Sequence, residues 1–425
     1  MTLAGDFPAS SRRAFLRETA MMAAAVPMVL PSMGTAAAAV KDPDQLFRKG
    51  EFDEAARGYR RLLSKDPKNA HAAAQLGYIA LLSNRFAAAE RFLSTATALD
   101  PGDVASHQRL AECYVRQDKF ARAVPLLKRT GSPRDAAFAT LYAHITGTPW
   151  QIHGARSSRV PFLQLDPLPT IEASVNGRAG RFYLDTGATL GLTQEIAEEA
   201  GLRSLATVSG IGSGQQITIH LGVLESFRIG DIEIRNLPVQ WHDTQSPPGG
   251  AQPEGIIGTT LFYHFLTTMD YAGQALVLRP KSAVQERGTY RVPLWLAGDH
   301  SPCTRGSLGD YGPHIVTLDT GGIGTGIHTT VQYAKRADIK VDYDHPNEVN
   351  GVSVYPIRPD RISLGKAIRR NVPGSAAEKT FPGYPGPGQA EQFGFEIIAN
   401  FSHEFFKPFA VTFDFSGMNL VITRR

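Results

Sequence analysis

The chain uses one short pattern twice. Residues 182–188 read Phe-Tyr-Leu-Asp-Thr-Gly-Ala, and residues 315–322 read Ile-Val-Thr-Leu-Asp-Thr-Gly-Gly. Each apolar run stops at Asp-Thr-Gly, which predicts a buried strand that delivers a carboxylate to a tight turn. A buried carboxylate is costly unless another group pairs with it. Two such turns facing each other would supply that pairing, because neighbouring carboxylates can share one proton and hold one water between them.

The two turns, Leu184 to Ala188 and Leu318 to Gly321, resemble the active-site turns of the pepsin and retropepsin clan of aspartic peptidases. The resemblance implies that the two Asp residues activate water, that the Thr hydroxyls cross-brace the turns, and that the Gly residues let each turn close. The matching residues are Asp185, Thr186, Gly187, Asp319, Thr320 and Gly321. One Asp-Thr-Gly alone fits an ordinary surface Asx turn. Two copies behind apolar strands favour the peptidase.

Further landmarks recur in the same order after each Asp, which indicates an internal duplication. A short helical pattern follows each turn, and each half closes on a similar strand (269–278 and 413–422). The resemblance also implies a hydrophobic element behind each turn, where only a very small residue fits. We assign this loop-backing element to Ile256, Ile257 and Gly258 in the first half and to Ile397, Ile398 and Ala399 in the second. Ala399 in the Gly position departs from the family pattern.

A Gly-rich stretch in the first half is a candidate flap. It consists of Gly210, Ile211, Gly212, Ser213 and Gly214, between two predicted strands. Such a hairpin tip suits a mobile lid over an extended peptide, although an ordinary flexible hairpin is the alternative. The second half has no equally Gly-rich stretch, so the sequence predicts a single flap, as in bilobal pepsins.

The N-terminus resembles a twin-arginine export signal. Arg12 and Arg13 precede an apolar stretch at 21–30 and an Ala-rich stretch at 35–39. The apolar stretch is shorter than the roughly 20 residues that cross a bilayer, and no Cys lies near the expected cleavage site. The sequence therefore predicts a periplasmic or secreted protein, exported by the twin-arginine route and without a stable membrane anchor.

Residues 42–147 carry a second repeat, with a period of 34 that places Phe52, Phe86 and Phe120 in register. This period resembles the tetratricopeptide repeat, a helix-turn-helix unit in which small Ala residues let paired helices approach. The resemblance predicts a helical solenoid whose concave face holds a protein partner or a substrate peptide. A packing or spacer domain is the alternative.

These features predict a multidomain fold of the α plus all-β class. A tetratricopeptide-like solenoid would precede a duplicated pair of retropepsin-like β-barrels in a pepsin-like, two-lobed arrangement. The expected boundaries are 1–39 for the signal peptide, 42–147 for the repeats, 148–169 for a linker, 170–285 for the first lobe and 286–425 for the second. A chain of 425 residues with 42% hydrophobic content is long enough for two or three cores.

Other chemistries fit the sequence less well. The formal charge of +4 and the lack of a basic run with interleaved aromatics give no argument for nucleic acid. Residues 321–326 lack the Gly-x-Gly-x-x-Gly spacing of a dinucleotide loop, and the 12 His residues are not spaced as metal ligands. No Gly-x-Ser-x-Gly is present for a serine hydrolase. We therefore expect no metal and no cofactor.

The sequence thus predicts a monomeric aspartic-type endopeptidase that acts on a peptide or protein substrate. One ionised Asp would take a proton from the attacking water, and the other, protonated, would hydrogen-bond the scissile carbonyl. Which Asp holds the proton stays open, because the pair titrates as a unit. The repeats would recruit substrate or a partner. The alternative is a non-catalytic periplasmic scaffold that binds peptides or proteins.

Overall fold

The structure, a computed structural model, describes residues 41–212, 215–242, 253–284 and 290–424. The expected signal peptide falls outside these residues and stays a prediction. Within the described ranges, no helix combines the length and apolarity needed to cross a membrane.

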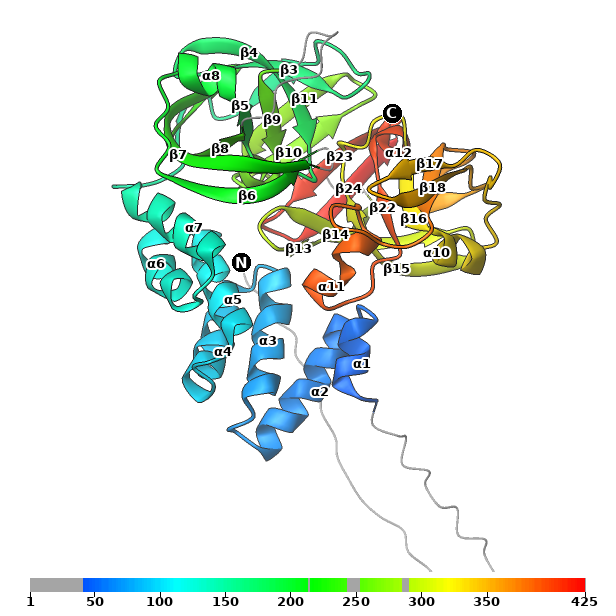
Figure 1. The fold of residues 1–425 in the computed structure, drawn as a ribbon, viewed down its shortest axis with the longest axis horizontal. Coiled ribbons are helices and arrows are strands. Elements are labelled where there is room, and N and C mark those ends of the chain that lie inside the picture. The colour runs from blue at the N-terminus through cyan, green and yellow to red at the C-terminus, as the bar shows by residue number, and fades with distance from the viewer. Residues whose placement is uncertain (1–40, 213–214, 243–252, 285–289, 425) are drawn as a thin grey trace, which may run out of the picture. The chain divides into compact units, whose positions relative to one another are not determined.

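The N-terminal part of the described chain is helical (Figure 1). Its helices are α1 (Pro43–Arg48), α2 (Phe52–Lys65), α3 (Ala70–Leu82), α4 (Phe86–Leu99), α5 (Val104–Val115), α6 (Phe120–Arg129) and α7 (Pro133–His144). Asn69 and Asp103 cap α3 and α5, since each side chain accepts a hydrogen bond from an amide of the first turn. Helices α3 and α4 approach closely at Gly77, where an added Cβ would overlap the side chain of Leu93. The predicted helical repeat region is confirmed.

The C-terminal part is rich in β-structure (Figure 1), and its described residues form three sheets. The eight-stranded sheet has the order β1 (Gln151–Gly154), β8 (Ile232–His242), β5 (Gly191–Thr193), β9 (Gly255–Gly258), β4 (Arg178–Asp185), β3 (Thr170–Val175), β7 (Gln215–Ile229) and β6 (Ala206–Gly212). The six-stranded sheet has the order β12 (Arg291–Pro293), β24 (Asn419–Arg424), β23 (Phe409–Asp414), β10 (Phe265–Asp270), β11 (Ala275–Pro280) and β2 (Ser158–Pro161).

The third sheet has the order β17 (Asn347–Val349), β18 (Val352–Ile357), β21 (Gly374–Ala377), β16 (Ile327–Thr330), β22 (Ala399–Phe401), β15 (Tyr311–Leu318), β14 (Ser301–Leu308), β19 (Ile362–Leu364) and β20 (Ala367–Arg369), with β13 (Trp295–Ala297) paired to β14. Short helices complete this part: α8 (Gln194–Glu199), α9 (Thr259–Phe262), α10 (Val331–Arg336), η1 (Pro387–Gln389), α11 (Ala390–Phe393) and α12 (His403–Phe406).

The six-stranded sheet joins the two halves of the β-rich part. Strands β10 and β11 come from the first half and β23 and β24 from the second, and β10 pairs antiparallel with β23. At the centre of this pairing, the hydroxyls of Thr268 and Thr412 lie 2.7 Å apart. A continuous ladder of backbone hydrogen bonds between the halves limits their relative motion.

The segment 148–169, predicted as a linker, instead contributes strands to two sheets. Strand β1 pairs with β8 in the eight-stranded sheet, and β2 pairs with β11 in the six-stranded sheet. Trp150 and Val160, which lie in this segment, are buried. The Pro, Arg, Ser and Gly content of the segment suggested a loop because sequence periodicity does not reveal short strands that add to a sheet edge.

The helical part shares a hydrophobic core with the second half of the β-rich part. The ring of Phe52 lies 5.3 Å from Trp295 and 5.2 Å from Phe395, centroid to centroid. The buried guanidinium of Arg116 donates hydrogen bonds to the carbonyl oxygens of Leu296 and Gly298. These contacts pack the helical repeats against the β-rich part. The two parts are therefore joined by side-chain contacts as well as by the connecting chain.

Candidate active site

The structure brings the two Asp-Thr-Gly turns together through reciprocal hydrogen bonds. The Thr186 amide donates to the Thr320 hydroxyl at 2.9 Å, and the Thr320 amide donates to the Thr186 hydroxyl at 3.1 Å. Each hydroxyl also donates across to the other strand, from Thr186 to the Leu318 carbonyl and from Thr320 to the Leu184 carbonyl. Both Thr residues are 1% exposed. Every donor and acceptor of this buried bridge is therefore satisfied.

The bridge places each Gly of one turn against the carboxylate of the other. A Cβ added at Gly187 would overlap the Asp319 carboxyl group, and one added at Gly321 would overlap that of Asp185. Each of these glycine amides also donates to the Asp of its own turn, at 2.7 Å to Asp185 and 2.9 Å to Asp319. Only Gly permits the two carboxylates to face each other at this separation.

The electrostatic environment of the two carboxylates favours a proton shared between them. Burial raises the pKa of Asp185 well above its usual value of 3.8, and the neighbouring charge and hydrogen bond of Asp319 raise it further. The amides of Gly187 and Gly321 act in the opposite direction. Two carboxylates in contact therefore hold one proton to a higher pH than isolated carboxyl groups do.

This raised pKa predicts how stability depends on pH. The folded protein holds the proton more tightly than the unfolded chain, so the contribution to the free energy of unfolding is present below about pH 3.8 and is lost as pH rises through the raised pKa. We expect Asp185→Asn, which is neutral at every pH, to be more stable than wild type at pH 7, on the order of 1 kcal/mol per unit of pKa shift. Thermal unfolding between pH 3.5 and 8 measures this, with Asp53→Asn on exposed α2 as the control. A stability difference that does not change with pH would contradict the shared proton.

Asn400 and Ser402 contact the second turn, and the sequence analysis did not single them out. The Asn400 amide donates to Asp319 Oδ2 at 3.3 Å, and its oxygen accepts from Thr317 Oγ1 at 2.7 Å, which fixes the orientation of the amide. The Ser402 hydroxyl donates to the Asp319 carbonyl at 2.6 Å and accepts from the Gly322 amide at 2.9 Å. Together they hold the second turn by side-chain hydrogen bonds.

The loop-backing element of the second half was assigned to the wrong residues. In the first half, β9 runs parallel to β4 and Gly258 pairs with Asp185, as expected for the assigned element. In the second half, Ala399 pairs with Val316, and the Asp319 amide bonds to the carbonyl of Phe401. The residue that corresponds to Gly258 is therefore Ser402, and Ile397, Ile398 and Ala399 lie earlier along the chain.

The physical reason for this error is the register of a parallel strand. The family pattern has two apolar residues before a small one, but the strand that lies behind the second turn reads Ala-Asn-Phe-Ser at 399–402. Ile397 is buried instead in the core shared with the helices. In the first half, a Cβ at Gly258 would overlap the Ala188 carbonyl, so the small residue is required there. The Ser402 side chain instead takes part in the hydrogen bonding of its turn.

The predicted flap lies on a hairpin. Gly210, Ile211 and Gly212 end β6, which pairs antiparallel with β7 from Gly212↔Gln215 onward. Ser213 and Gly214 fall outside the described residues. The role of this hairpin as a lid stays a prediction.

A cavity of about 140 Å³ lies beside the carboxylate pair. Its lining includes Gly187, Asp319, Ser301, Tyr384 and Gln389. Turns of both halves thus contribute to one space, which is what a substrate that passes between them requires.

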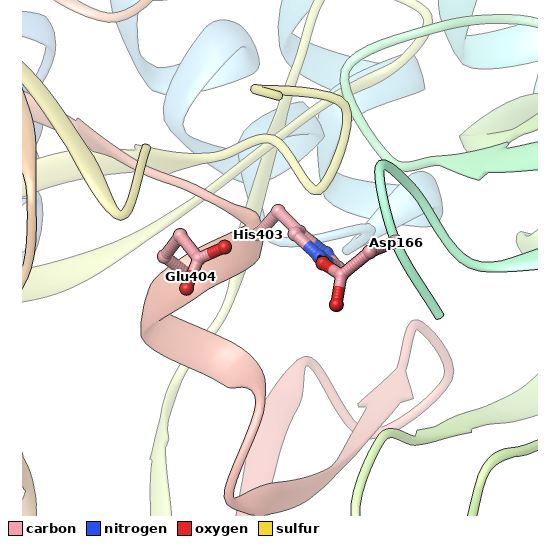
Figure 2. Close-up of side chains that lie close together, drawn as sticks. All are labelled: Asp166, His403 and Glu404. Carbon is pink, nitrogen blue, oxygen red and sulfur yellow. The ribbon is translucent and has the colours of Figure 1, made fainter. Parts of the chain in front are cut away.

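A separate cluster of Asp166, His403 and Glu404 has the residue types of a metal site (Figure 2). The ring of His403 lies 3.0 Å from Asp166 through Nε2, and burial lowers the pKa of His403. The Lys407 ammonium lies 2.6 Å from Asp166 and 2.5 Å from Glu404. Because Lys407 already occupies the position between the two carboxylates, the cluster is an ion-pair network rather than a cation site.

Comparisons with known proteins agree with the two repeated patterns. Residues 171–261 match the sequence model of the aspartyl proteases, and residues 46–105 and 80–145 match that of the tetratricopeptide repeat. The chain carries an aspartyl protease domain and tetratricopeptide repeats. The aspartyl protease match includes Asp185 and Gly258 and ends before the second Asp-Thr-Gly turn.

No curated protein matches this chain. Among solved structures, a mutant O-GlcNAc transferase from Thermobaculum terrenum is 22% identical over 26% of this chain, with a TM-score of 0.23. This chain spans 22% of the length of that structure. A likeness of this size carries no argument about function.

Proposed function

We propose that the chain is an aspartic endopeptidase whose two β lobes form a duplicated, pepsin-like pair. The observation that carries this proposal is the reciprocal bridge between Thr186 and Thr320, which sets Asp185 and Asp319 face to face. Two carboxylates in contact repel each other when both are ionised, and this repulsion destabilises the folded protein. A scaffold that only binds peptides gains nothing from it. A pair that shares one proton can both accept and donate a proton, as hydrolysis of an amide requires.

The proposed mechanism gives the two carboxylates different roles. Asn400 directs an N–H at Asp319 Oδ2, and a donated hydrogen bond favours the ionised form of a carboxylate, so we infer that Asp185 carries the shared proton more of the time. Asp319 would then take a proton from the bound water as its oxygen adds to the scissile carbonyl carbon, while Asp185 donates a hydrogen bond to the carbonyl oxygen. The proton taken by Asp319 passes to the amine as the C–N bond breaks, and both products leave.

Substitution of Asn400 tests this inference. Ile256 lies in the matching position of the first half, so Asn400→Ile copies the other lobe. Loss of the N–H donor disfavours the singly ionised pair, and we expect the acidic limb of the pH–rate profile to move up by as much as about one unit. Asn400→Asp is unsuitable as a control because it adds charge, whereas Asn400→Gln keeps an amide. An acidic limb that stays in place in Asn400→Ile would contradict the inferred distribution of the proton.

We further propose that this enzyme works as a monomer in the periplasm. Both Asp-Thr-Gly turns come from one chain, so no second copy is needed to complete the pair. The twin-arginine motif at Arg12 and Arg13 supports export, and the repeats support recruitment of a substrate or partner. The proposal includes no metal, cofactor, nucleic acid or membrane anchor.

Digestion of a broad peptide library tests the proposal. Purified protein is incubated with the library from pH 3 to 8, and the products are read by mass spectrometry. Internal cuts that depend on the protein are expected for an endopeptidase. The alternative scaffold predicts peptides that are retained intact on the immobilised protein, with no new termini at any pH.

A further inference from the structure

Two adjoining cavities lie between the repeats and the β-rich part. The larger, about 310 Å³, is lined by residues of α3, α5 and α7, by Gly298 and Asp299, and by Gln392 and Phe393 of α11. The smaller, about 90 Å³, reaches Thr189 and Leu190, which follow the first Asp-Thr-Gly turn. Both cavities are lined by Glu112, Val115, Arg116, Phe138, Tyr142 and Asp299. They therefore form one groove, called here the repeat groove, that runs from the helices towards that turn.

Arg109 of α5 presents an unpaired charge to the repeat groove. Its guanidinium lies 3.9 Å above the ring of Tyr78, and the Tyr78 hydroxyl is held by the carbonyl of Phe393. Within the ranges that the structure describes, no hydrogen bond or ion pair engages this guanidinium. Burial lowers the pKa of Arg109, which reflects the cost of keeping the cation away from water. A carboxylate ligand would offset that cost, because a guanidinium offers a planar fork of donors.

The acidic groups of the repeat groove already have partners. Glu112 pairs with Arg116 at 2.8 Å, and Asp135 accepts from Gln108 at 2.7 Å. Asp299 pairs with His300, and its pKa is lowered chiefly by that neighbour against the effect of burial. Arg134 adds a second cation, 3.9 Å from both Asp135 and Asp299. Among the Arg side chains that line the groove in the described ranges, Arg109 is the one without a hydrogen bond or ion pair, and the carboxylate of Asp103 acts on it only at longer range.

The smaller cavity has an apolar wall. Its lining includes Phe120, Leu141, Trp150, Leu190, Leu221 and Leu296. The apolar side chains on this wall of a space of about 90 Å³ favour contact with an aliphatic group. The repeat groove thus combines an apolar pocket near the first turn with an unpaired cation on the helices.

We propose that the repeat groove binds an internal acidic segment of the substrate polypeptide, with an Asp or Glu side chain on Arg109 and an aliphatic side chain in the apolar pocket. As a statement about substrates, this rests on the proposed peptidase activity. The ligand proposed is an internal acidic side chain, and peptides with amidated or free C-termini distinguish it from a chain terminus.

Binding of fluorescent peptides to the full-length protein tests the proposal. The probe peptides contain Leu and Glu at varied spacing, and matched peptides carry Gln in place of Glu; all have amidated C-termini. We expect Arg109→Gln to weaken binding of the Glu peptide by about tenfold to a hundredfold and to leave the Gln peptide unchanged. Arg109→Lys should recover part of the loss. Arg91→Gln is the matched control, since Arg91 also lies over a ring, that of Phe92, but outside the groove.

The outcomes separate this inference from the proposed function. Binding that depends on Glu and on Arg109, but without cleavage, leaves the groove in place and removes the peptidase. Cleavage with equal kcat/KM for Glu and Gln peptides in wild type and Arg109→Gln overturns the groove and keeps the peptidase. A peptide with a free C-terminal carboxylate and no acidic side chain that binds as tightly as the Glu probe would also overturn the proposal, because the ligand would then be a chain terminus.

Discussion

Replacing either Asp185 or Asp319 with Asn is expected to lower kcat by at least about a thousandfold. The amide cannot take a proton from water or share one with the remaining carboxylate. The side chain keeps nearly the same shape, so the reciprocal bridge of Thr186 and Thr320, which uses no Asp side-chain atom, should persist. The loss should therefore fall on kcat, with KM close to that of wild type.

Steady-state kinetics on a peptide selected from the library digest measure this effect. Asp360→Asn, at an exposed position of the second half, serves as the control and should behave as wild type. Thermal unfolding shows whether each variant is folded. A folded Asp185→Asn or Asp319→Asn protein that retains more than about a tenth of the wild-type kcat would exclude catalysis by the pair.

The second large effect is expected at the bridge itself. Thr320→Val removes a hydroxyl that accepts from the Thr186 amide and donates to the Leu184 carbonyl. Two buried groups would lose their partners, at about 1 to 3 kcal/mol each, so the free energy of unfolding should fall by about 2 to 6 kcal/mol. Activity should fall as well, because the two carboxylates would no longer be held at a fixed separation.

Thr320→Ser and Thr186→Ser are the matched controls, because each keeps the hydroxyl. Chemical denaturation gives the change in stability, and kcat at saturating substrate gives the change in catalysis. Thr186→Val should resemble Thr320→Val, since its hydroxyl makes the mirror-image contacts with Thr320 and Leu318. A Val variant as stable and as active as its Ser control would show that the bridge contributes little.

The sequence predicted well those features that short sequence motifs determine. Asp-Thr-Gly after an apolar strand fixes the turn, and its second copy suggests the partner, so the contact of Asp185 with Asp319 was expected. The period that relates Phe52, Phe86 and Phe120 led to the helical repeats in the same way. In both cases a local element, a turn or a helix pair, is determined by residues close together in sequence, and its recurrence along the chain shows that it is repeated.

The features that the sequence did not reveal depend on contacts between distant segments. Ser402 and Asn400 lie behind the second turn because of the register of β22 on β15, which apolar spacing does not determine. The burial of Arg116 against the carbonyl of Leu296 likewise joins the repeats to the β-rich part across a long stretch of chain. Arg109 belongs to no sequence motif. The role proposed for it depends on the lack of a hydrogen bond or ion pair to its guanidinium among the described residues of the folded protein.

The most direct test of the account is a library digest in ¹⁸O-labelled water by wild type, Asp185→Asn and Asp319→Asn, side by side. The account predicts internal cuts by wild type, one labelled oxygen in each new C-terminal carboxyl group, and no cuts above background by either variant. In a single turnover with excess wild type, the label should enter the product and neither Asp side chain, because water rather than a carboxylate attacks the carbonyl. Equal cleavage by all three proteins, or label recovered in Asp185 or Asp319 of the wild type, would contradict the claim that this pair hydrolyses peptides by activating water.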